Sequence, residues 1–422
     1  MVKVFKFGGA SVRDIDRINQ VFDILNTFKQ DKILIVISAM GKMTNALEKV
    51  VKAHYDPKQD AFAALNKVKS FHYSIMDDLF DPEDPVYASI NDTLVEIEWM
   101  IEEEVHINYD YTYDQIVSVG ELLSTKIVSA YLNKRGIQNQ WLDARDVIHT
   151  DNTFRDGRIN WQLTNERIQN KIPVIVDQQM IVTQGFIGST SENFTCTLGR
   201  EGSDYSAAVF AYSLNAESVS IWKDVPGILT GDPTLFKEVE KMDELSYREA
   251  IEMTYYGAKV IHPKTIKPLQ NKNIPLHVKS FLEPEGSGTI ISNKQIKNYP
   301  PIVVVEHDQC MIHISVNDFS FVAEHHLSEI FALLAKYRIK VNLMRNTAIS
   351  FTVCADHIIE RVAPFISELE NHYKVLKETN LELITVRHSE DEMLQKLEKG
   401  KVILMEERLK DTVQMVVRII PS

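Results

Sequence analysis

The sequence predicts an α/β protein whose mostly parallel sheet is sandwiched by helices, followed by a smaller α+β domain. Apolar strand-like runs alternate with segments of helical periodicity over residues 1–292, as expected of parallel βαβ units. Beyond residue 302 the order of runs is strand, helix, strand, strand, helix, strand, which is the ferredoxin-like plan. The length of 422 residues also exceeds what a single hydrophobic core ordinarily supports. Two domains are therefore expected, over 1–292 and 302–422.

The first domain is expected to hold six strands and an insertion of helices. Residues 12–28 place apolar side chains at spacings of three and four, which predicts an amphipathic helix between the first two strands. Residues 57–115 interrupt the alternation, are rich in Asp, Glu and Tyr, and predict a helical insertion beside the sheet. The expected strands are 2–7, 33–37, 173–176, 181–185, 219–222 and 276–280.

The domain boundary is expected at residues 291–301, which are polar, aperiodic and end in two prolines. After the ferredoxin-like unit, a short helix and one or two strands are expected over residues 400–420. Apolar runs such as QMVVRII, residues 414–420, favour pairing of edge strands across a twofold axis. The expected elements of the unit itself are strand 302–316, helix 327–337, strands 340–344 and 350–354, helix 357–373 and strand 381–387.

Composition excludes several classes of partner. The formal net charge of −13 argues against nucleic acid or an anionic membrane surface as the main partner. The three cysteines are widely spaced and form no CxxC pair, so a disulfide scaffold or a zinc knuckle is not expected. No stretch approaches the roughly 18 apolar residues of a membrane span, and the first residues lack the pattern of a signal peptide. A cytoplasmic location is expected.

The stretch KVFKFGGASV, residues 3–12, ends an apolar run in a Gly-Gly turn. Such a turn brings backbone N–H groups close to an anion, and a lysine beside it supplies a point charge for the same anion. Lys6, Gly8, Gly9 and Ser11 are therefore candidates for a phosphate site. An ordinary strand, turn and helix, with the lysine pointing into water, explains the pattern equally well.

Two expected helix starts carry charged residues. Glu121, in SVGELLSTKIVSAYL, either complements the helix dipole or binds a substrate ammonium group, and the local pattern alone favours the dipole. In TCTLGREGSDYSAAVFAYSL, Ser203 and Asp204 suit helix capping, but capping does not explain Arg200 between two glycines. An arginine beside a helix N-terminus is suited to bind a carboxylate bidentately, so an anion site is favoured there.

Two further stretches, taken alone, can be explained without a functional role. SIWKDVPGILTGDP, residues 220–233, places two tight turns after a strand, which either shapes a binding loop or merely connects two elements. In YYGAKVIHPKTI, residues 255–266, Lys259 follows the Gly-Ala pair and lies near a histidine, and by itself this pattern indicates a surface lysine.

Together these five stretches resemble the aspartate kinases of the amino-acid kinase superfamily. The patterns KFGG-S-V, S-x-GE, T-x-GRxGSD, W-x-DVPG and YGAKV-x-HP occur in this order over residues 3–263. The tail from residue 302 resembles, more loosely, the ACT regulatory region of the same enzymes. The resemblance implies an amino-acid kinase catalytic domain over 1–292 and an ACT-like regulatory and dimerisation domain over 302–422.

The activity that this resemblance implies is phosphoryl transfer from ATP to the β-carboxylate of L-aspartate. The product is 4-phospho-L-aspartate, in the first step of lysine, threonine and methionine biosynthesis; Mg²⁺ and a homodimer through the ACT region are implied with it. The physical chemistry agrees, because a carboxylate nucleophile is already deprotonated at neutral pH and needs no general base. It needs relief from the repulsion between two anions and in-line positioning, which lysines, backbone donors and Mg²⁺ supply.

The resemblance also implies roles for individual residues. Lys6 and Lys259 are expected to contact the ATP phosphates as catalytic residues, and Asp204 is expected to orient those lysines. Further nucleotide contacts are implied at Gly8, Gly9, Ser11, Lys223 and Asp224. No protein ligand for a metal is implied. Aspartate contacts are implied at Thr44, in SAMGKMTNAL, at Glu121, which would face the ammonium group, at Arg200, which would hold a carboxylate, and at Ser203.

The chain departs from the family pattern at several places, two of which bear on ligand binding. Glu201 stands where many relatives have glycine, and we expect its carboxylate to turn outward, away from the anion site. In the tail, Asn342, Thr347 and Ala348 stand where charged partners of an effector ammonium group occur in feedback-controlled relatives. Strong inhibition by lysine is therefore not expected.

Two other functions stay open at this point. Another kinase of the superfamily, acting on glutamate, acetylglutamate or UMP, would not usually combine S-x-GE with T-x-GRxGSD and an ACT tail. A non-catalytic amino-acid sensor would have lost a phosphate-binding lysine or the run from Arg200 to Asp204, and both are intact. Trapping of the acyl phosphate with hydroxylamine, using a panel of acceptors, separates these possibilities.

Overall fold

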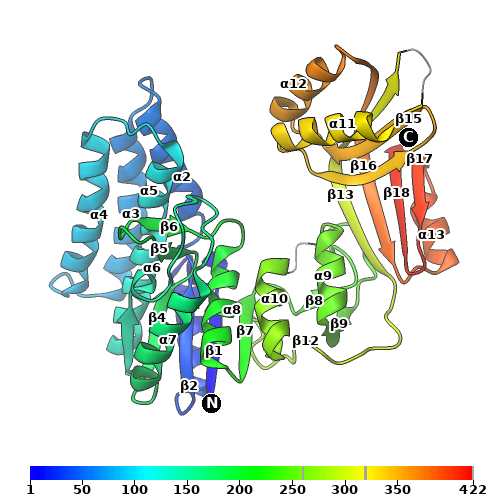
Figure 1. Cartoon of the computed structure of the whole chain (residues 1–422). Helices are drawn as coiled ribbons and strands as arrows, with labels where there is room; N and C mark the ends of the chain where they lie inside the picture. The colour runs from blue at the N-terminus through cyan, green and yellow to red at the C-terminus, as the bar shows by residue number, and fades with distance from the viewer. Residues whose placement is uncertain (259–260, 318–320, 421–422) are drawn as a thin grey trace. The chain divides into compact units, whose positions relative to one another are not determined.

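The computed structural model describes residues 1–258, 261–317 and 321–420, and the chain divides into two compact units. The chain passes from the first unit to the last part of the second between residues 296 and 297, within the polar segment 291–301. Figure 1 labels most of the helices and strands of both units. The first unit comprises Met1–Ile228, Lys241–Ile251 and Val260–Ile296, and the second comprises Leu229–Glu240, Glu252–Lys259 and Lys297–Ser422.

The first unit is built on an eight-stranded sheet with the strand order β10-β12-β11-β7-β1-β2-β4-β3. Among the described residues, the pairing of β11 with β12 is antiparallel and the other pairings in this sheet are parallel. The expectation of a mostly parallel sheet is confirmed. The strands are β1 (Val2–Phe7), β2 (Lys32–Ile37), β3 (Asn139–Leu142), β4 (Met180–Gln184), β7 (Ser218–Lys223), β10 (Glu244–Ser246), β11 (Leu276–Ser280) and β12 (Thr289–Ser292).

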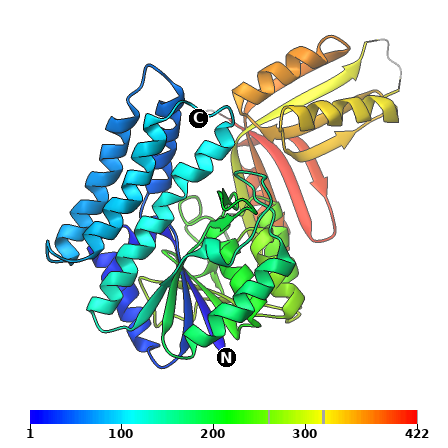
Figure 2. The ribbon, with the colours of Figure 1, turned by 60° about the vertical axis from the view of Figure 1, so that its left-hand side comes forward.

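Helices lie on both sides of this sheet, and the blue-to-cyan helices stand beyond one end of it (Figure 2). Helices α3 and α4 and most of α5 lie within residues 57–115, where the sequence predicts a helical insertion. Two short strand pairs, β5 (Ile187–Ser189) with β6 (Thr195–Thr197) and β8 (Ile228–Leu229) with β9 (Lys241–Met242), complete the strands. The helices are α1 (Ile15–Thr27), α2 (Met43–Tyr55), α3 (Ala61–Leu79), α4 (Val86–Glu102), α5 (Tyr109–Val117), α6 (Val119–Lys134), α7 (Trp161–Val176), α8 (Gly202–Leu214), α9 (Tyr247–Tyr255) and α10 (Pro263–Lys272).

The expected strand over 173–176 is wrong, because these residues form the last turn of α7. Ile168, Ile172 and Val176 are buried at spacings of four, which is the periodicity of a helix face. Val174, in contrast, is 64% exposed, which a central parallel strand would not allow. A short run of branched aliphatic residues does not distinguish a strand from the end of a buried helix.

The second unit holds a six-stranded antiparallel sheet with the order β14-β15-β13-β16-β18-β17. The succession β13, α11, β14, β15, α12, β16 confirms the expected ferredoxin-like plan. The elements are β13 (Ile302–Val316), α11 (Glu324–Lys336), β14 (Val341–Asn346), β15 (Ser350–Asp356), α12 (Ile359–Leu369), β16 (Tyr373–Arg387), α13 (Asp391–Glu398), β17 (Lys401–Arg408) and β18 (Thr412–Ile419).

The run QMVVRII does not provide an edge strand, contrary to expectation. It belongs to β18, which pairs with β16 on one side and with β17 on the other. Met415 and Val417 are buried in one apolar cluster and Val416 in another, so both faces of the strand are covered. Two-sided burial explains why this run is so apolar. Across the described part of the chain, no helix has the length and apolar character needed to cross a membrane.

Candidate active site

Four adjacent parallel strands deliver side chains to one edge of the first unit's sheet. Strands β7, β1, β2 and β4 are neighbours and run in the same direction, so their carboxyl ends meet. Lys6 lies near the end of β1 and Lys223 at the end of β7, while Ser38 follows β2 and Phe186 follows β4. All four residues line one cavity of about 510 Å³.

This cavity collects charged side chains of both signs, with cations in excess among the described residues. A site of this composition favours anionic ligands and also offers carboxylates for a ligand's ammonium group. The cationic residues are Lys6, Arg155, Arg200 and Lys223, and the acidic residues are Glu121, Glu201 and Asp204. The remaining lining residues are Ser38, Thr44, Tyr113, Phe186, Thr197, Gly199, Gly202 and Ser203.

Asp204, in the first turn of α8, holds two of the lysines. Its Oδ1 atom lies 2.6 Å from Nζ of Lys6, and its Oδ2 atom lies 3.8 Å from Nζ of Lys223. The side chains of Lys6 and Asp204 are only 11% and 4% exposed. Burial by itself raises the pKa of Asp204, but the ammonium groups of Lys6 and Lys223 outweigh burial, so the pKa is lowered overall. The ionised carboxylate therefore fixes both ammonium groups at the sheet edge.

Glu121, in the first turn of α6, is buried with one oxygen unpaired. Its Oε1 atom accepts a hydrogen bond of 3.3 Å from the backbone N–H of Ala39. Its Oε2 atom has no hydrogen-bond partner among the described residues. Burial raises the pKa of Glu121 to about 8, and the Ala39 N–H and the Lys6 ammonium group oppose this change only in part. A buried carboxyl group on a cavity wall with a free oxygen is suited to receive an ammonium group from a ligand.

Close backbone contacts explain why two positions next to the cavity are occupied by glycine. A Cβ atom at Gly9 would lie 2.7 Å from the carbonyl oxygens of Ala39 and Gly41, so the turn after β1 packs directly on the loop after β2. A Cβ atom at Gly185 would lie 2.5 Å from Cβ of Ser203, so the start of α8 packs on the end of β4. Neither position accepts a side chain without displacing a neighbouring wall of the site.

Most of the residues expected at the site from the sequence line this cavity. The others are placed differently: Asp224 is exposed, and the Ser11 hydroxyl donates a hydrogen bond of 2.7 Å to the Gly8 carbonyl within the turn. Gly8 and Gly9 belong to that turn and are not among the residues lining the cavity. Lys259 lies outside the described residues. The expected residues that line the cavity are Lys6, Thr44, Glu121, Arg200, Ser203, Asp204 and Lys223.

The expectation that the Glu201 carboxylate turns outward is wrong. Glu201 lines the cavity, and its Oε2 atom accepts a hydrogen bond of 2.9 Å from the backbone N–H of His262. Its φ of 54° places the residue in the left-handed region just before α8. His262 precedes Pro263 at the start of α10, so the donor to the Glu201 carboxylate comes from a distant helix end that local sequence does not reveal.

Five lining residues were not singled out from the sequence. Ser38 and Thr197 lie within the stretches SAMGKMTNAL and T-x-GRxGSD, so their proximity in sequence to Thr44 and Arg200 is the signal that points to them. Tyr113 donates a hydrogen bond of 2.6 Å to Glu48, and burial raises the pKa of its hydroxyl. Arg155 and Phe186 come from loops without a recognisable local pattern. Tertiary folding alone brings them to the cavity.

Comparison with known proteins agrees with this architecture. The model of the amino acid kinase family matches residues 1–280. Lysine-sensitive aspartokinase 3 of Escherichia coli (strain K12) is 33% identical over 359 residues, which cover 84% of this chain and 78% of that protein. The chloroplastic aspartokinase 1 of Arabidopsis thaliana is 31% identical over 374 residues, covering 84% of this chain and 63% of that protein.

Solved structures of E. coli aspartokinase III share the fold over nearly the whole chain. The complex with lysine and aspartate, in the T-state, is 29% identical with a TM-score of 0.83 and covers 98% of this chain and 95% of that one. The complex with aspartate and ADP, in the R-state, is 29% identical with a TM-score of 0.84 and covers 99% and 96%. The chain belongs to the amino acid kinase family. Within that family it is an aspartate kinase.

Proposed function

We propose that this aspartate kinase transfers the γ-phosphoryl group of MgATP to the β-carboxylate of L-aspartate in the cavity at the carboxyl edge of the sheet. One observation carries the proposal: the Lys6–Asp204–Lys223 cluster lies in the same cavity as Glu121 and Arg200. The cavity thus combines a cationic wall for phosphates with partners for an amino acid. The aspartate and ADP in the similar E. coli structure support this pair of substrates.

On the phosphate side, Lys6 and Lys223 neutralise charge on the triphosphate as the γ-phosphoryl group moves. Asp204 holds both ammonium groups in place before substrate arrives, so little reorganisation is required in the transition state. The N-terminus of α8, with Ser203, adds donors for an anion. Lys259 is proposed as a second phosphate contact on the strength of the family motif.

Magnesium is proposed to enter as part of the MgATP substrate. Within residues 1–258, 261–317 and 321–420, no group of three or more His, Cys, Asp or Glu residues is placed to hold a metal ion. Mg²⁺ ordinarily keeps several waters and binds through substrate phosphates with one or two carboxylates, so such a group is not required. In this role the ion screens the charge of the phosphates.

On the amino-acid side, Glu121 faces the ammonium group of aspartate and Arg200 holds a carboxylate, with the Thr44 hydroxyl as a further polar contact. The β-carboxylate, already ionised, attacks the γ-phosphorus. The bond from that phosphorus to the bridging oxygen of ADP breaks, and ADP leaves with the electron pair. No proton has to be removed from the nucleophile, which agrees with a cavity that offers cations rather than a general base.

Hydroxylamine trapping tests the proposal. The purified protein is incubated with MgATP, hydroxylamine and one acceptor at a time: aspartate, glutamate, N-acetylglutamate or UMP. We expect the β-hydroxamate of aspartate and no hydroxamate from the other carboxylic acids, with UMP leaving ADP release at background. Hydroxamate from glutamate or N-acetylglutamate, or no product from aspartate, would overturn the assignment.

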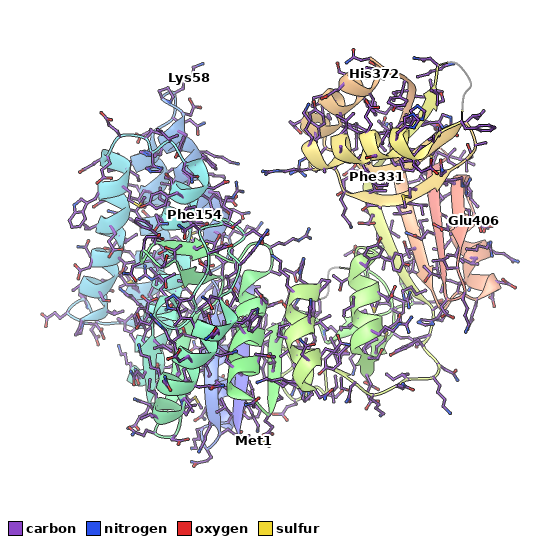
Figure 3. The ribbon with its side chains drawn as sticks, viewed as in Figure 1. Met1, Lys58, Phe154, Phe331, His372 and Glu406 are labelled. Atoms are coloured by element: carbon purple, nitrogen blue, oxygen red, sulfur yellow. The ribbon has the colours of Figure 1, made fainter. Side chains whose placement is uncertain are left out.

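The second unit is proposed to form a homodimer. Strand β14 is one edge of its sheet, and Met344 on this strand is 52% exposed. The aromatic ring of Phe331 on α11, labelled in Figure 3, is also largely exposed for an apolar side chain. Light scattering of the wild type and of Met344→Lys is the test, with a dimer expected for the former.

Free, buried cysteines at 196, 310 and 354 support the further proposal of a reducing, cytoplasmic setting.

A further inference from the structure

Arg155 is a second arginine in the cavity that no motif singled out. It lies in the loop between β3 and α7 and lines the same cavity as Arg200 and Glu121. Its backbone has a φ of 66°, in the left-handed region where a side chain costs energy and glycine is favoured. A residue other than glycine held in this conformation beside a ligand cavity raises the question of what its side chain does there.

One buried carboxylate fixes the backbone of both arginine-bearing segments. Oδ2 of Asp114 accepts hydrogen bonds from the N–H of Arg155 at 2.9 Å and from the N–H of Thr197 at 2.8 Å. Oδ1 of Asp114 accepts a third, of 2.6 Å, from the hydroxyl of Thr197, three residues before Arg200. The N–H of Gly157 also donates to the Thr197 carbonyl at 2.9 Å. Asp114 therefore fixes the backbone of Arg155 relative to that of Thr197, in the segment that leads to Arg200.

The loop carrying Arg155 is also packed on α5 through an aromatic contact. Phe154, labelled in Figure 3, meets Tyr111 edge to face, with ring centroids 5.4 Å apart. Together with the bond from the Gly157 N–H to the Thr197 carbonyl, this contact anchors the loop on both sides of the arginine. A guanidinium group on an anchored backbone loses less entropy when it binds a ligand.

The guanidinium group of Arg155 is held in place by its neighbours, yet it keeps N–H donors for a ligand. Its Cζ atom lies 4.2 Å from the centroid of the Tyr113 ring, and Nη1 is 3.1 Å from Oδ1 of Asp110. The side chains of this ion pair are 45% and 51% exposed, so the pair is weak and easily exchanged. A guanidinium has several N–H donors in a planar fork, and stacking on a ring leaves the edge of that fork available. Such an edge binds a carboxylate bidentately.

Aspartate presents two carboxylates, and they have different requirements. The β-carboxylate has to face the phosphates beside Lys6 and remain nucleophilic, which a second bound guanidinium group would oppose. The α-carboxylate takes no part in bond formation and benefits from both cations. We infer that Arg155 binds the α-carboxylate of aspartate together with Arg200, an inference that rests on the proposed function. Arg155 is then a specificity-determining contact for an α-amino dicarboxylic acid.

The first test separates substrate binding from loop structure. Arg155→Gln removes the charge, Arg155→Gly removes the side chain in a backbone that suits glycine, and Arg158→Gln in the same loop is the control. We expect KM for aspartate to rise by about 10- to 100-fold in both Arg155 variants, the range for a lost hydrogen bond to a charged group. We expect kcat and KM for MgATP to change by less than about twofold, with Tm not lowered in Arg155→Gly. The control should match the wild type.

A substrate analogue supplies the second test. Aspartate 1-amide keeps the β-carboxylate and the ammonium group but has a neutral amide in place of the α-carboxylate. With this acceptor, the KM of Arg155→Gln should approach that of the wild type. Unchanged KM for aspartate in both variants, an equal penalty with the amide, or a loss in kcat alone would each overturn the inference. Failure of the wild type to form any aspartyl hydroxamate would instead overturn the proposed function.

Discussion

The free energy of unfolding of ligand-free Glu121→Gln, relative to that of the wild type, should increase as pH rises. The same substitution should weaken aspartate binding. Glu121 is 2% exposed, and burial raises its pKa from an ordinary value of 4.5 to about 8. Below a pH of about 4.5, Glu121 is protonated in both the folded and the unfolded chain, so its ionisation does not make the free energy of unfolding depend on pH. Between the two values the unfolded chain releases a proton that the folded chain keeps, so the wild type loses stability as pH rises. Above about 8 the full cost remains.

The size of this effect follows from the two pKa values. At about 1.4 kcal/mol per pH unit, the cost of Glu121 is about 3 kcal/mol at pH 7 and about 5 kcal/mol above pH 8. Glutamine escapes this cost but buries amide atoms that need partners, a penalty of about 1–3 kcal/mol that does not vary with pH. The stability difference between variant and wild type should therefore increase by about 2 kcal/mol between pH 6 and pH 8.

Urea unfolding without ligands at pH 6, 7 and 8 measures this difference. All four tryptophans, at positions 99, 141, 161 and 222, belong to the first unit, so their fluorescence follows the unit that contains Glu121. Glu217→Gln, at an exposed glutamate, is the control and should show no trend with pH. A variant whose stability difference from the wild type is the same at all three pH values would refute the reasoning. In the hydroxamate assay, KM for aspartate should rise at least about tenfold in Glu121→Gln.

Three further predictions concern pH, packing and regulation. In the wild type, KM for aspartate should fall as pH rises from about 6.5 to 8.5, because Glu121 must lose its proton before it pairs with an ammonium group; a flat profile in initial-rate measurements would contradict this. Gly9→Ala should lower stability by about 1–3 kcal/mol and reduce kcat, since its Cβ would lie 2.7 Å from two carbonyl oxygens, and urea unfolding with kinetics checks both. Millimolar lysine should change the activity by less than about twofold. The reason is that Asn342 offers no carboxylate to an effector ammonium group and instead donates hydrogen bonds of 3.0 Å to Gln309 and Asp356. Strong inhibition in a lysine titration would count against this prediction.

Much of the first unit is predictable from the sequence, because the central strands of its sheet are short apolar runs buried on both faces. The same property caused the error at 173–176, where burial of Ile172 and Val176 belongs to a helix face. The run at 414–420 was correctly read as a strand, but its place in the sheet depends on pairings that no local pattern encodes.

The residues of the site likewise divide into those that the sequence predicts and those that only the tertiary structure reveals. Lys6, Arg200 and Asp204 stand in motifs whose residue types already indicate anion binding, and the structure places them on one cavity. Arg155 is held at that cavity by contacts distant in the sequence, such as the bond from its N–H to Asp114, which is 41 residues away in the chain. The orientation of Glu201 is not predictable for the same reason, since its partner is the N–H of His262 at the start of another helix. Contacts made by tertiary folding were beyond the reach of local sequence.

The central claim is that the lysine on β1 acts on the phosphates during transfer. The most direct measurement is kcat for β-aspartyl hydroxamate in Lys6→Ala and Lys6→Gln, the second of which keeps a hydrogen-bond donor near Asp204. The control is Lys3→Ala on the same strand, whose ammonium group pairs with Asp31 at 3.1 Å. We predict a loss of about 100-fold or more in both Lys6 variants, as for removal of a group that stabilises transition-state charge, and near-normal turnover in the control. Near-normal turnover in folded Lys6→Gln would contradict the account.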